Sequence, residues 1–209
     1  FMVLVNVGYT AWILPLFNRL TPLAEGEVRD KLLQYAAKVN FPVKHIFVMD
    51  GSKRSAKANA FFSGFGKRKK VVLYDTLLEQ HPPEELVAVL AHEIGHYKKK
   101  HLKWGMLISV LQVGLLLFLL GQVVFSESMS LALGGSSWSV HLNILGFTML
   151  FTPLSMVLGI GMNWLSRRHE FEADQYAKET YGGKPLAEAL KTLSVKTLST
   201  IYPHPWYVF

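Results

Sequence analysis

Two histidines and a glutamate occur in the sequence HEIGH at positions 92–96. This is the HExxH pattern, in which His92 and His96 share one face of a helix and can bind one zinc ion. Glu93 follows the first histidine directly, so its carboxylate can reach a water molecule at the metal and act as a general base. The preceding run Leu86–Ala91 is apolar and favours a helix, which places the motif inside one. The structural alternative is an exposed helix face that happens to carry two histidines.

A catalytic zinc site needs a third protein ligand, and the sequence offers two carboxylates for it. Glu170 and Asp174 are four residues apart and would share a helix face. One of them can bind the metal while the other accepts a hydrogen bond from the ring N–H of a ligand histidine. Glu172 would point roughly 200° away from Glu170, and on a continuous helix His101 would lie about 140° from His96, so both are poorer candidates. An exposed face of charged residues is the structural alternative here.

The composition limits the kind of metal site and the kind of partner. The 209 residues include no cysteine, so a metal must be held by histidines and carboxylates. There are 22 Lys and Arg against 15 Asp and Glu, a net charge of +7, which permits an anionic membrane surface, a nucleic acid or an acidic substrate group as partner. We find no nucleic-acid-binding module, so we expect no nucleic-acid partner.

Two uncharged stretches are candidates for membrane spans. Gly105–Phe125 and Leu142–Leu165 carry no Asp, Glu, Lys or Arg, and each is long enough to cross a bilayer. Half of the chain is apolar, in agreement with membrane segments. The alternative is two buried core helices, for which a domain of this size has little room.

Basic residues precede the first candidate span and follow the second one in the sequence. Lys98–Lys100 and Lys103 precede the first span and Arg167–Arg168 follow the second, while the loop Ser126–Val140 carries only Glu127 as a charged residue. By the positive-inside rule, both flanks are cytoplasmic and the loop lies on the other side. The two halves of the predicted metal site would therefore lie together at the cytoplasmic boundary of the membrane.

The rest of the chain predicts a small sheet and further helices. Apolar residues recur at helical spacing in Glu25–Val39, and Pro82–Glu85 is typical of a helix start. The sequence predicts three strands, at Ile46–Met49, Asn59–Phe65 and Val71–Tyr74. We expect them to form an antiparallel sheet. The fold class is thus a mainly α membrane protein with a small β-sheet and a zincin-like metallopeptidase core.

We expect residues 1–209 to belong to one membrane metallopeptidase domain that extends beyond both ends of this chain. Its predicted parts are the end of a membrane helix (1–14), a zincin-like part with the HExxH helix (19–104), two membrane spans (105–125 and 142–165), and the third-ligand helix with the segment after it (166–209).

Three stretches, Val89–His96, Ser166–Asp174 and Asp50–Gly66, resemble the type I CaaX prenyl protease family. The resemblance covers essentially the whole chain. Members of that family are multi-pass membrane gluzincins whose helices enclose a chamber around the zinc, and they cleave prenylated proteins. The family has further helices before the part that corresponds to Phe1. It also has a His-Pro-Pro run beyond the part that corresponds to Phe209.

The resemblance also assigns roles to individual residues. It implies that His92, His96 and Glu170 bind one Zn²⁺ per chain, that Glu93 is the base, and that Asp174 supports a ligand from behind. Asn59-Ala60 matches the family's strand motif that meets the substrate backbone.

The sequence therefore predicts a zinc-dependent membrane endopeptidase that hydrolyses peptide bonds near the C-terminus of prenylated CaaX proteins. We expect it in the endoplasmic reticulum membrane or a bacterial inner membrane, with a prenylated protein or peptide and the lipid bilayer as partners. One alternative is a quality-control metallopeptidase of the heat-stress type, with unmodified membrane proteins as substrates. Another is a non-catalytic membrane scaffold stabilised by zinc, which an intact Glu93 disfavours. The oligomeric state is not predicted.

Overall fold

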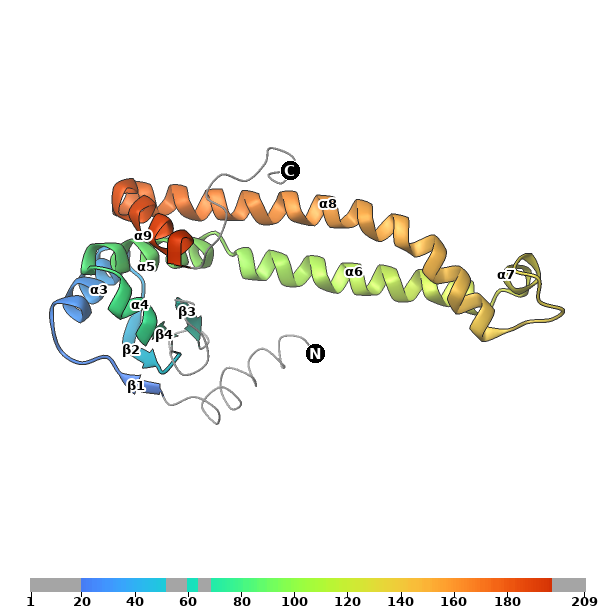
Figure 1. The fold of residues 1–209 in the computed structure, drawn as a ribbon, viewed down its shortest axis with the longest axis horizontal. Helices are drawn as coiled ribbons and strands as arrows, with labels where there is room; N and C mark the ends of the chain where they lie inside the picture. The colour runs from blue at the N-terminus through green and yellow to red at the C-terminus, as the bar shows by residue number, and fades with distance from the viewer. Residues whose placement is uncertain (1–19, 52–59, 64–68, 197–209) are drawn as a thin grey trace. The chain divides into compact units, whose positions relative to one another are not determined.

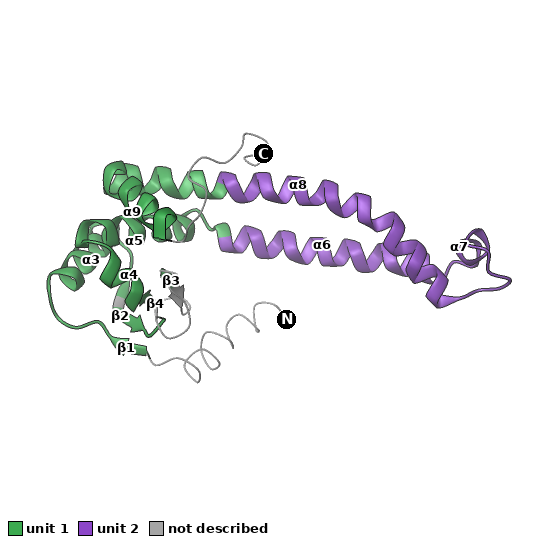
Figure 2. Ribbon diagram, in the orientation of Figure 1, with its two compact units in different colours: residues 1–101, 169–208 green, residues 102–168, 209 purple. Residues whose placement is uncertain are grey.

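The computed structural model describes residues 20–51, 60–63 and 69–196. The chain divides into two compact units, which Figure 2 colours green and purple. Unit 1 comprises residues 1–101 and 169–208, and unit 2 comprises residues 102–168 with residue 209. The predicted membrane helix at 1–14 lies outside the described residues.

Unit 1 contains a four-stranded mixed sheet (Figure 1). Its strands are β1 (Leu20–Pro22), β2 (Val43–Met49), β3 (Ala60–Ser63) and β4 (Lys69–Tyr74), in the order β1-β2-β4-β3. The β2–β4 pair is parallel and the other two pairs are antiparallel. The predicted all-antiparallel sheet of three strands is therefore wrong in strand number and in one strand direction. The reason is that β3 pairs with the far edge of β4, which leaves β2 and β4 as neighbours.

Helices make up most of the described chain, as expected for the predicted fold class. They are α3 (Glu27–Lys38), α4 (Asp75–Gln80), α5 (Pro83–Lys98), α6 (His101–Val124), α7 (Glu127–Ala132), α8 (Val140–Thr180) and α9 (Gly183–Lys196). The two helices predicted around Glu25–Val39 and after Pro82 are present as α3 and α5. The short helices α4 and α7 were not predicted, because each spans fewer than two turns and shows little periodicity.

Helix α5 forms the centre of the hydrophobic core of unit 1. Its buried face packs against α3, the sheet and α9, and the core residues of α5 are Leu86, Val87, Ala88, Leu90, Ala91 and Ile94. Burial of each large apolar side chain contributes about 1.5–3 kcal/mol. At the start of the helix Pro83 needs no hydrogen-bond partner for its nitrogen, and Glu84 and Glu85 favour the positive end of the helix dipole. The helix with the HExxH motif is thus fixed on several sides.

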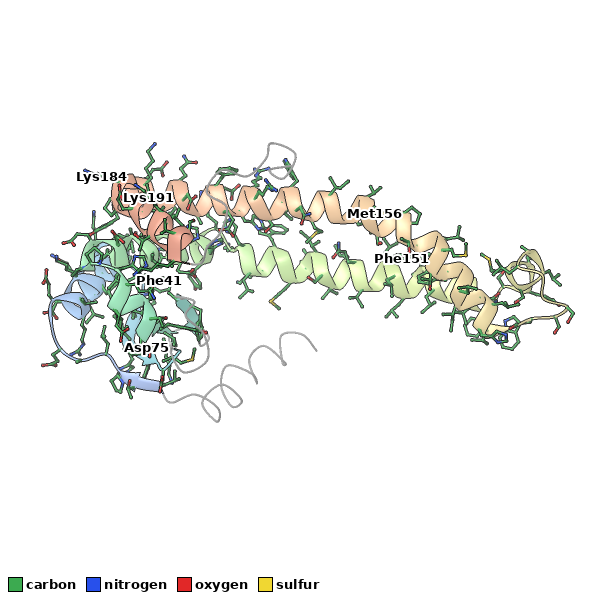
Figure 3. The ribbon with its side chains drawn as sticks, viewed as in Figure 1. Phe41, Asp75, Phe151, Met156, Lys184 and Lys191 are labelled. Atoms are coloured by element: carbon green, nitrogen blue, oxygen red, sulfur yellow. The ribbon has the colours of Figure 1, made fainter. Side chains whose placement is uncertain are left out.

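Two contacts with side chains labelled in Figure 3 tie the surrounding segments of unit 1 together. Phe41, after α3, is buried and packs edge-to-face on Tyr97 of α5, with 5.1 Å between ring centroids. Asp75, at the start of α4, accepts a hydrogen bond through Oδ1 from the backbone N–H of Gly51 at 3.0 Å, and another from that of Thr76 at 2.8 Å. These contacts hold the ends of the sheet beside the motif helix.

The helices α6 and α8 are long and apolar enough to cross a membrane. No residue in the most apolar window of α6 is buried, and 6% of the corresponding window of α8 is buried. Leu111, Phe118 and Met156 are more than 60% exposed, and Figure 3 labels Met156 on α8. A pair of core helices in a soluble protein would bury such side chains, so the alternative of two buried core helices is wrong for unit 2.

Helix α8 continues without a break through Pro153 and into the segment that carries Glu170. The hydroxyl groups of Thr148, Thr152 and Ser155 donate to main-chain carbonyl oxygens three or four residues earlier, at 2.7–2.9 Å. The helix remains continuous across the proline. The second apolar span and the third-ligand segment are therefore one helix, not two.

The segment between α6 and α8 is an organised turn within unit 2. Asn143 is fully buried and its amide nitrogen donates to the carbonyl oxygens of Val124 at 2.9 Å and Ser126 at 2.8 Å. Its side-chain oxygen accepts a hydrogen bond from Ser130 of α7 at 2.8 Å. One amide thus joins the end of α6, helix α7 and the start of α8, where the sequence predicted only a polar loop.

Candidate metal centre

The two motif histidines lie on one face of α5, as their spacing predicts. Their Nε2 atoms are 3.1 Å apart, and both side chains are partly exposed. Ile94 and Gly95, between them in sequence, are buried. The helix therefore turns its apolar surface to the core and its two imidazoles to the opposite side.

Helix α8 brings Glu170 to the same point. Its Oε2 atom lies 3.5 Å from Nε2 of His92 and 3.6 Å from Nε2 of His96. Tetrahedral zinc with bonds of about 2.0–2.2 Å separates its ligand atoms by about 3.3–3.6 Å. Two imidazole nitrogens and one carboxylate oxygen are also a donor set that zinc commonly uses, with a fourth position left for water or substrate. The two distances to Glu170 fall in this range and the 3.1 Å between the histidine nitrogens lies just below it, so these three side chains fit a catalytic zinc ion.

Asp174 lies behind the first histidine. Its Oδ1 atom is 2.8 Å from Nδ1 of His92, which donates a hydrogen bond to the carboxylate. A proton on Nδ1 leaves the lone pair of Nε2 free to face His96 and Glu170. Of the two carboxylates that the sequence offered, Glu170 thus lies beside both Nε2 atoms, and Asp174 contacts Nδ1 of His92.

The second histidine has a partner that sequence reasoning set aside. Nδ1 of His96 is 2.9 Å from Nδ1 of His101, and Nε2 of His101 is 3.1 Å from Oε2 of Glu172. The helical angle that set His101 aside assumed one continuous helix. Helix α5 instead ends at Lys98, and Lys100 has a left-handed backbone with φ of 61°. The turn brings His101 back onto His96, and no glycine or proline in the sequence marks it.

Glu93 is half-buried beside the candidate metal position, and the pKa of its carboxyl group is raised. Burial raises the pKa of its carboxyl group to about 7. The electrostatic effect of His92 opposes this rise, and the negative charge of Glu170 adds to it. A raised pKa makes the ionised carboxylate a stronger proton acceptor. Burial, followed by the electrostatic effect of His92, lowers the pKa of His96 and favours the neutral imidazole that binds metals.

A small cavity of about 150 Å³ opens beside His92 and Glu93. Its other walls are mostly apolar: Ala60 of β3, Leu77 of α4, Val89 of α5, and Leu186, Leu190 and Leu193 of α9. Ala60 is thus at the site, whereas the neighbouring Asn59 lies outside the described residues. The contribution of α9 was missed, because its pattern of leucines is that of an ordinary amphipathic helix.

Comparison with known proteins identifies the family. A family model for Peptidase family M48 matches residues 22–208, which is most of the chain. The chain belongs to peptidase family M48. Membership of this metallopeptidase family implies a metal ion, typically zinc. The cluster of His92, His96 and Glu170 is a possible site for it.

Curated relatives carry the name of the family that the sequence resembles. CAAX prenyl protease 1 homolog from Oryza sativa subsp. japonica is 40% identical over 95% of this chain. CAAX prenyl protease 1 homolog from Homo sapiens is 32% identical over 94% of it. The alignments cover 47% and 50% of those proteins, so the chain spans about half the length of the relatives it matches.

A solved structure has the same fold. The crystal structure of S. mikatae Ste24p matches 99% of this chain and 52% of its own, with a TM-score of 0.86 and 35% sequence identity. The predicted fold class, a mainly helical membrane protein with a small sheet, is confirmed by this match together with the two apolar helices. The resemblance to the type I CaaX prenyl proteases is confirmed by the relatives.

Proposed function

We propose that this chain carries the catalytic centre of a zinc-dependent membrane endopeptidase that cleaves prenylated CaaX proteins near their C-terminus. The observation that carries the proposal is the triangle of two imidazole nitrogens and one carboxylate oxygen, 3.1–3.6 Å apart, with the carboxyl group of Glu93 beside it. The relatives that are 40% and 32% identical to this chain are named CAAX prenyl protease 1 homolog, which supports the substrate class.

His92, His96 and Glu170 would hold one zinc ion per chain. When bound there, zinc supplies Lewis-acid chemistry, by acidifying water and polarising the scissile carbonyl group. Glu93 accepts the proton of the attacking water and returns it to the amine nitrogen of the leaving peptide. Burial raises the pKa of the Glu93 carboxyl group, which makes its carboxylate a stronger proton acceptor. Asp174 keeps the imidazole of His92 in the orientation and protonation state that a ligand needs.

The substrate would bind along β3 and fill the small apolar cavity. β3 lies at the end of the strand order, so an extended peptide can pair with it as an added strand. Asn59 and Ala60 would contribute this backbone pairing, and the leucines of α9 would contact one aliphatic side chain of the peptide next to Glu93. Backbone pairing is largely indifferent to sequence, which leaves the lipid group and this cavity to select the substrate.

Replacement of Glu93 by glutamine tests the catalytic role. The amide cannot accept a proton, so we expect hydrolysis to fall by about 100- to 10,000-fold while zinc content stays the same. Rates and metal content are measured on the purified protein in detergent. Glu79→Gln makes the same change on the exposed surface of α4 and serves as control. A Glu93→Gln protein that keeps its activity within about tenfold of the parent would refute the mechanism.

The effect of a prenyl group on the rate of hydrolysis distinguishes this proposal from a quality-control peptidase. Each buried CH₂ of a lipid contributes about 0.8 kcal/mol, so a farnesyl group should raise kcat/KM for the peptide that carries it. The test compares one CaaX peptide with and without its farnesyl group, in liposomes, with Glu93→Gln as the blank. Equal values, or a preference for unmodified apolar peptides, would assign the protein to the quality-control class. No hydrolysis of either peptide would instead favour the zinc-stabilised scaffold.

The charges around the two apolar helices support one orientation in the membrane. We place Lys98–Lys100 and Arg167–Arg168 on the cytoplasmic side, and the Ser126–Val140 turn on the opposite side, by the positive-inside rule. With this orientation the metal centre would lie at the cytoplasmic boundary, in the endoplasmic reticulum membrane or a bacterial inner membrane.

The chain contains no cysteine, so single cysteines report this orientation cleanly. We expect an impermeant thiol reagent added to the cytoplasmic side of sealed vesicles to label Lys99→Cys and not Ser136→Cys. Both positions are exposed in the structure. Detergent-opened vesicles, in which both should react, are the control. Labelling of both positions from one side of sealed vesicles would contradict the two-span orientation.

A further inference from the structure

The outer nitrogens of the two candidate ligand histidines are held differently. Nδ1 of His92 donates directly to a carboxylate, that of Asp174. Nδ1 of His96 meets a second imidazole, that of His101, which in turn meets the carboxylate of Glu172. The distances along this second path are 2.9 Å and 3.1 Å, both within hydrogen-bond range.

One arrangement of protons satisfies the whole path when Nε2 of His96 faces the metal position. Nδ1 of His96 must then carry a proton, because one nitrogen of a neutral imidazole is a donor and the other an acceptor. That proton is donated to Nδ1 of His101, whose own proton is therefore on Nε2. Nε2–H of His101 donates to Oε2 of Glu172, which as a carboxylate only accepts. The carboxylate thus fixes the direction of both hydrogen bonds.

The surroundings hold His101 in this position. Its side chain is 6% exposed, and the left-handed residue Lys100 directs it back toward α5. The ring of His169 stacks on the ring of His101, with centroids 4.1 Å apart and an angle of 10° between the planes. His101 is therefore fixed by burial, by stacking and by hydrogen bonds at both of its nitrogens.

We propose that His101 and Glu172 are positioning residues for His96, and that Glu172 acts on the metal site through His101. The proposal rests on the proposed zinc site. Helix α8 would then supply one metal ligand, Glu170, and both carboxylates that orient the histidines, Asp174 and Glu172. Glu172 and Glu170 lie on different faces of α8. Glu172 acts on His96 indirectly, because His101 contacts both of these side chains.

The readout is zinc affinity, measured by competition with a chelator on the purified protein in detergent. Loss of a partner that orients a metal ligand typically weakens metal binding by 10- to 100-fold, and we expect this range for Glu172→Ala. Glu172→Gln keeps an oxygen that accepts from His101, so its affinity should lie closer to that of the parent. Glu179→Ala, an exposed glutamate on the same helix, is the matched control and should not change the affinity.

A double-mutant comparison separates the relay from a general structural effect. Because Glu172 acts through His101, the protein with His101→Ala and Glu172→Ala together should bind zinc no more weakly than His101→Ala alone. Additive losses would overturn the relay. His101 is buried, so its replacement can prevent folding; in that case the affinity of Glu172→Ala decides, and a value within about twofold of the parent overturns the proposal.

Glu170→Ala in the same assay distinguishes the two proposals. If Glu170→Ala abolishes zinc binding and Glu172→Ala has no effect, the zinc site stands and the positioning role is wrong. If zinc binding is unchanged in Glu170→Ala as well, the zinc site itself is wrongly assigned, and the positioning role fails with it.

Discussion

The close approach of α5 and α8 at Gly95 is the contact on which the metal centre depends. A Cβ atom at Gly95 would lie 3.0 Å from Cα of Ala173, 3.1 Å from its carbonyl oxygen and 3.2 Å from Cβ of Tyr176. The first two are main-chain atoms, which a rotamer change cannot move away. Ala173 is fully buried and lies between Glu170 and Asp174 in the sequence. Two small residues thus let two helix backbones touch, and the contact brings the carboxylates of one helix to the histidines of the other.

A zinc site accepts only small errors in the positions of its ligands, which is why such a contact is needed. Zinc bonds of about 2.0–2.2 Å leave little freedom for the ligands, and a helix displaced by the width of a methyl group would take Glu170 out of reach. The remaining faces of α5 are held by apolar packing with α3, the sheet and α9. The polar face is held by hydrogen bonds from both histidines to groups behind them. Apolar burial therefore fixes the helix, and polar contacts fix the imidazoles on it.

The same arrangement sets the chemistry of Glu93. Burial and the nearby carboxylate of Glu170 raise its pKa, and His92 opposes them. The apolar cavity lined by α9 lies next to it, so a peptide that fills the cavity would meet the carboxyl group directly. A cation at the neighbouring site would favour the ionised carboxylate, which is the form that accepts a proton.

Local patterns in the sequence were enough to predict several of the residues that the structure brings together at the candidate centre. The spacing of His92 and His96, and of Glu170 and Asp174, follows from the helical repeat, and the uncharged stretches marked α6 and α8. The parallel pairing of β2 with β4 was not predictable, because the alternation of side chains does not record which strands are neighbours. His101 was misplaced because the turn at Lys100 has no glycine or proline to mark it. Gly95 was visible, but which helix it contacts is decided by the fold.

The location of the zinc ion is the most direct test of this account. Anomalous diffraction at the zinc absorption edge, from crystals of the purified protein, shows where the metal is bound. The account predicts a single peak, about 2.0–2.2 Å from Nε2 of His92, Nε2 of His96 and a carboxylate oxygen of Glu170. A peak held by other residues, or a zinc ion with no contact to Glu170, would contradict it.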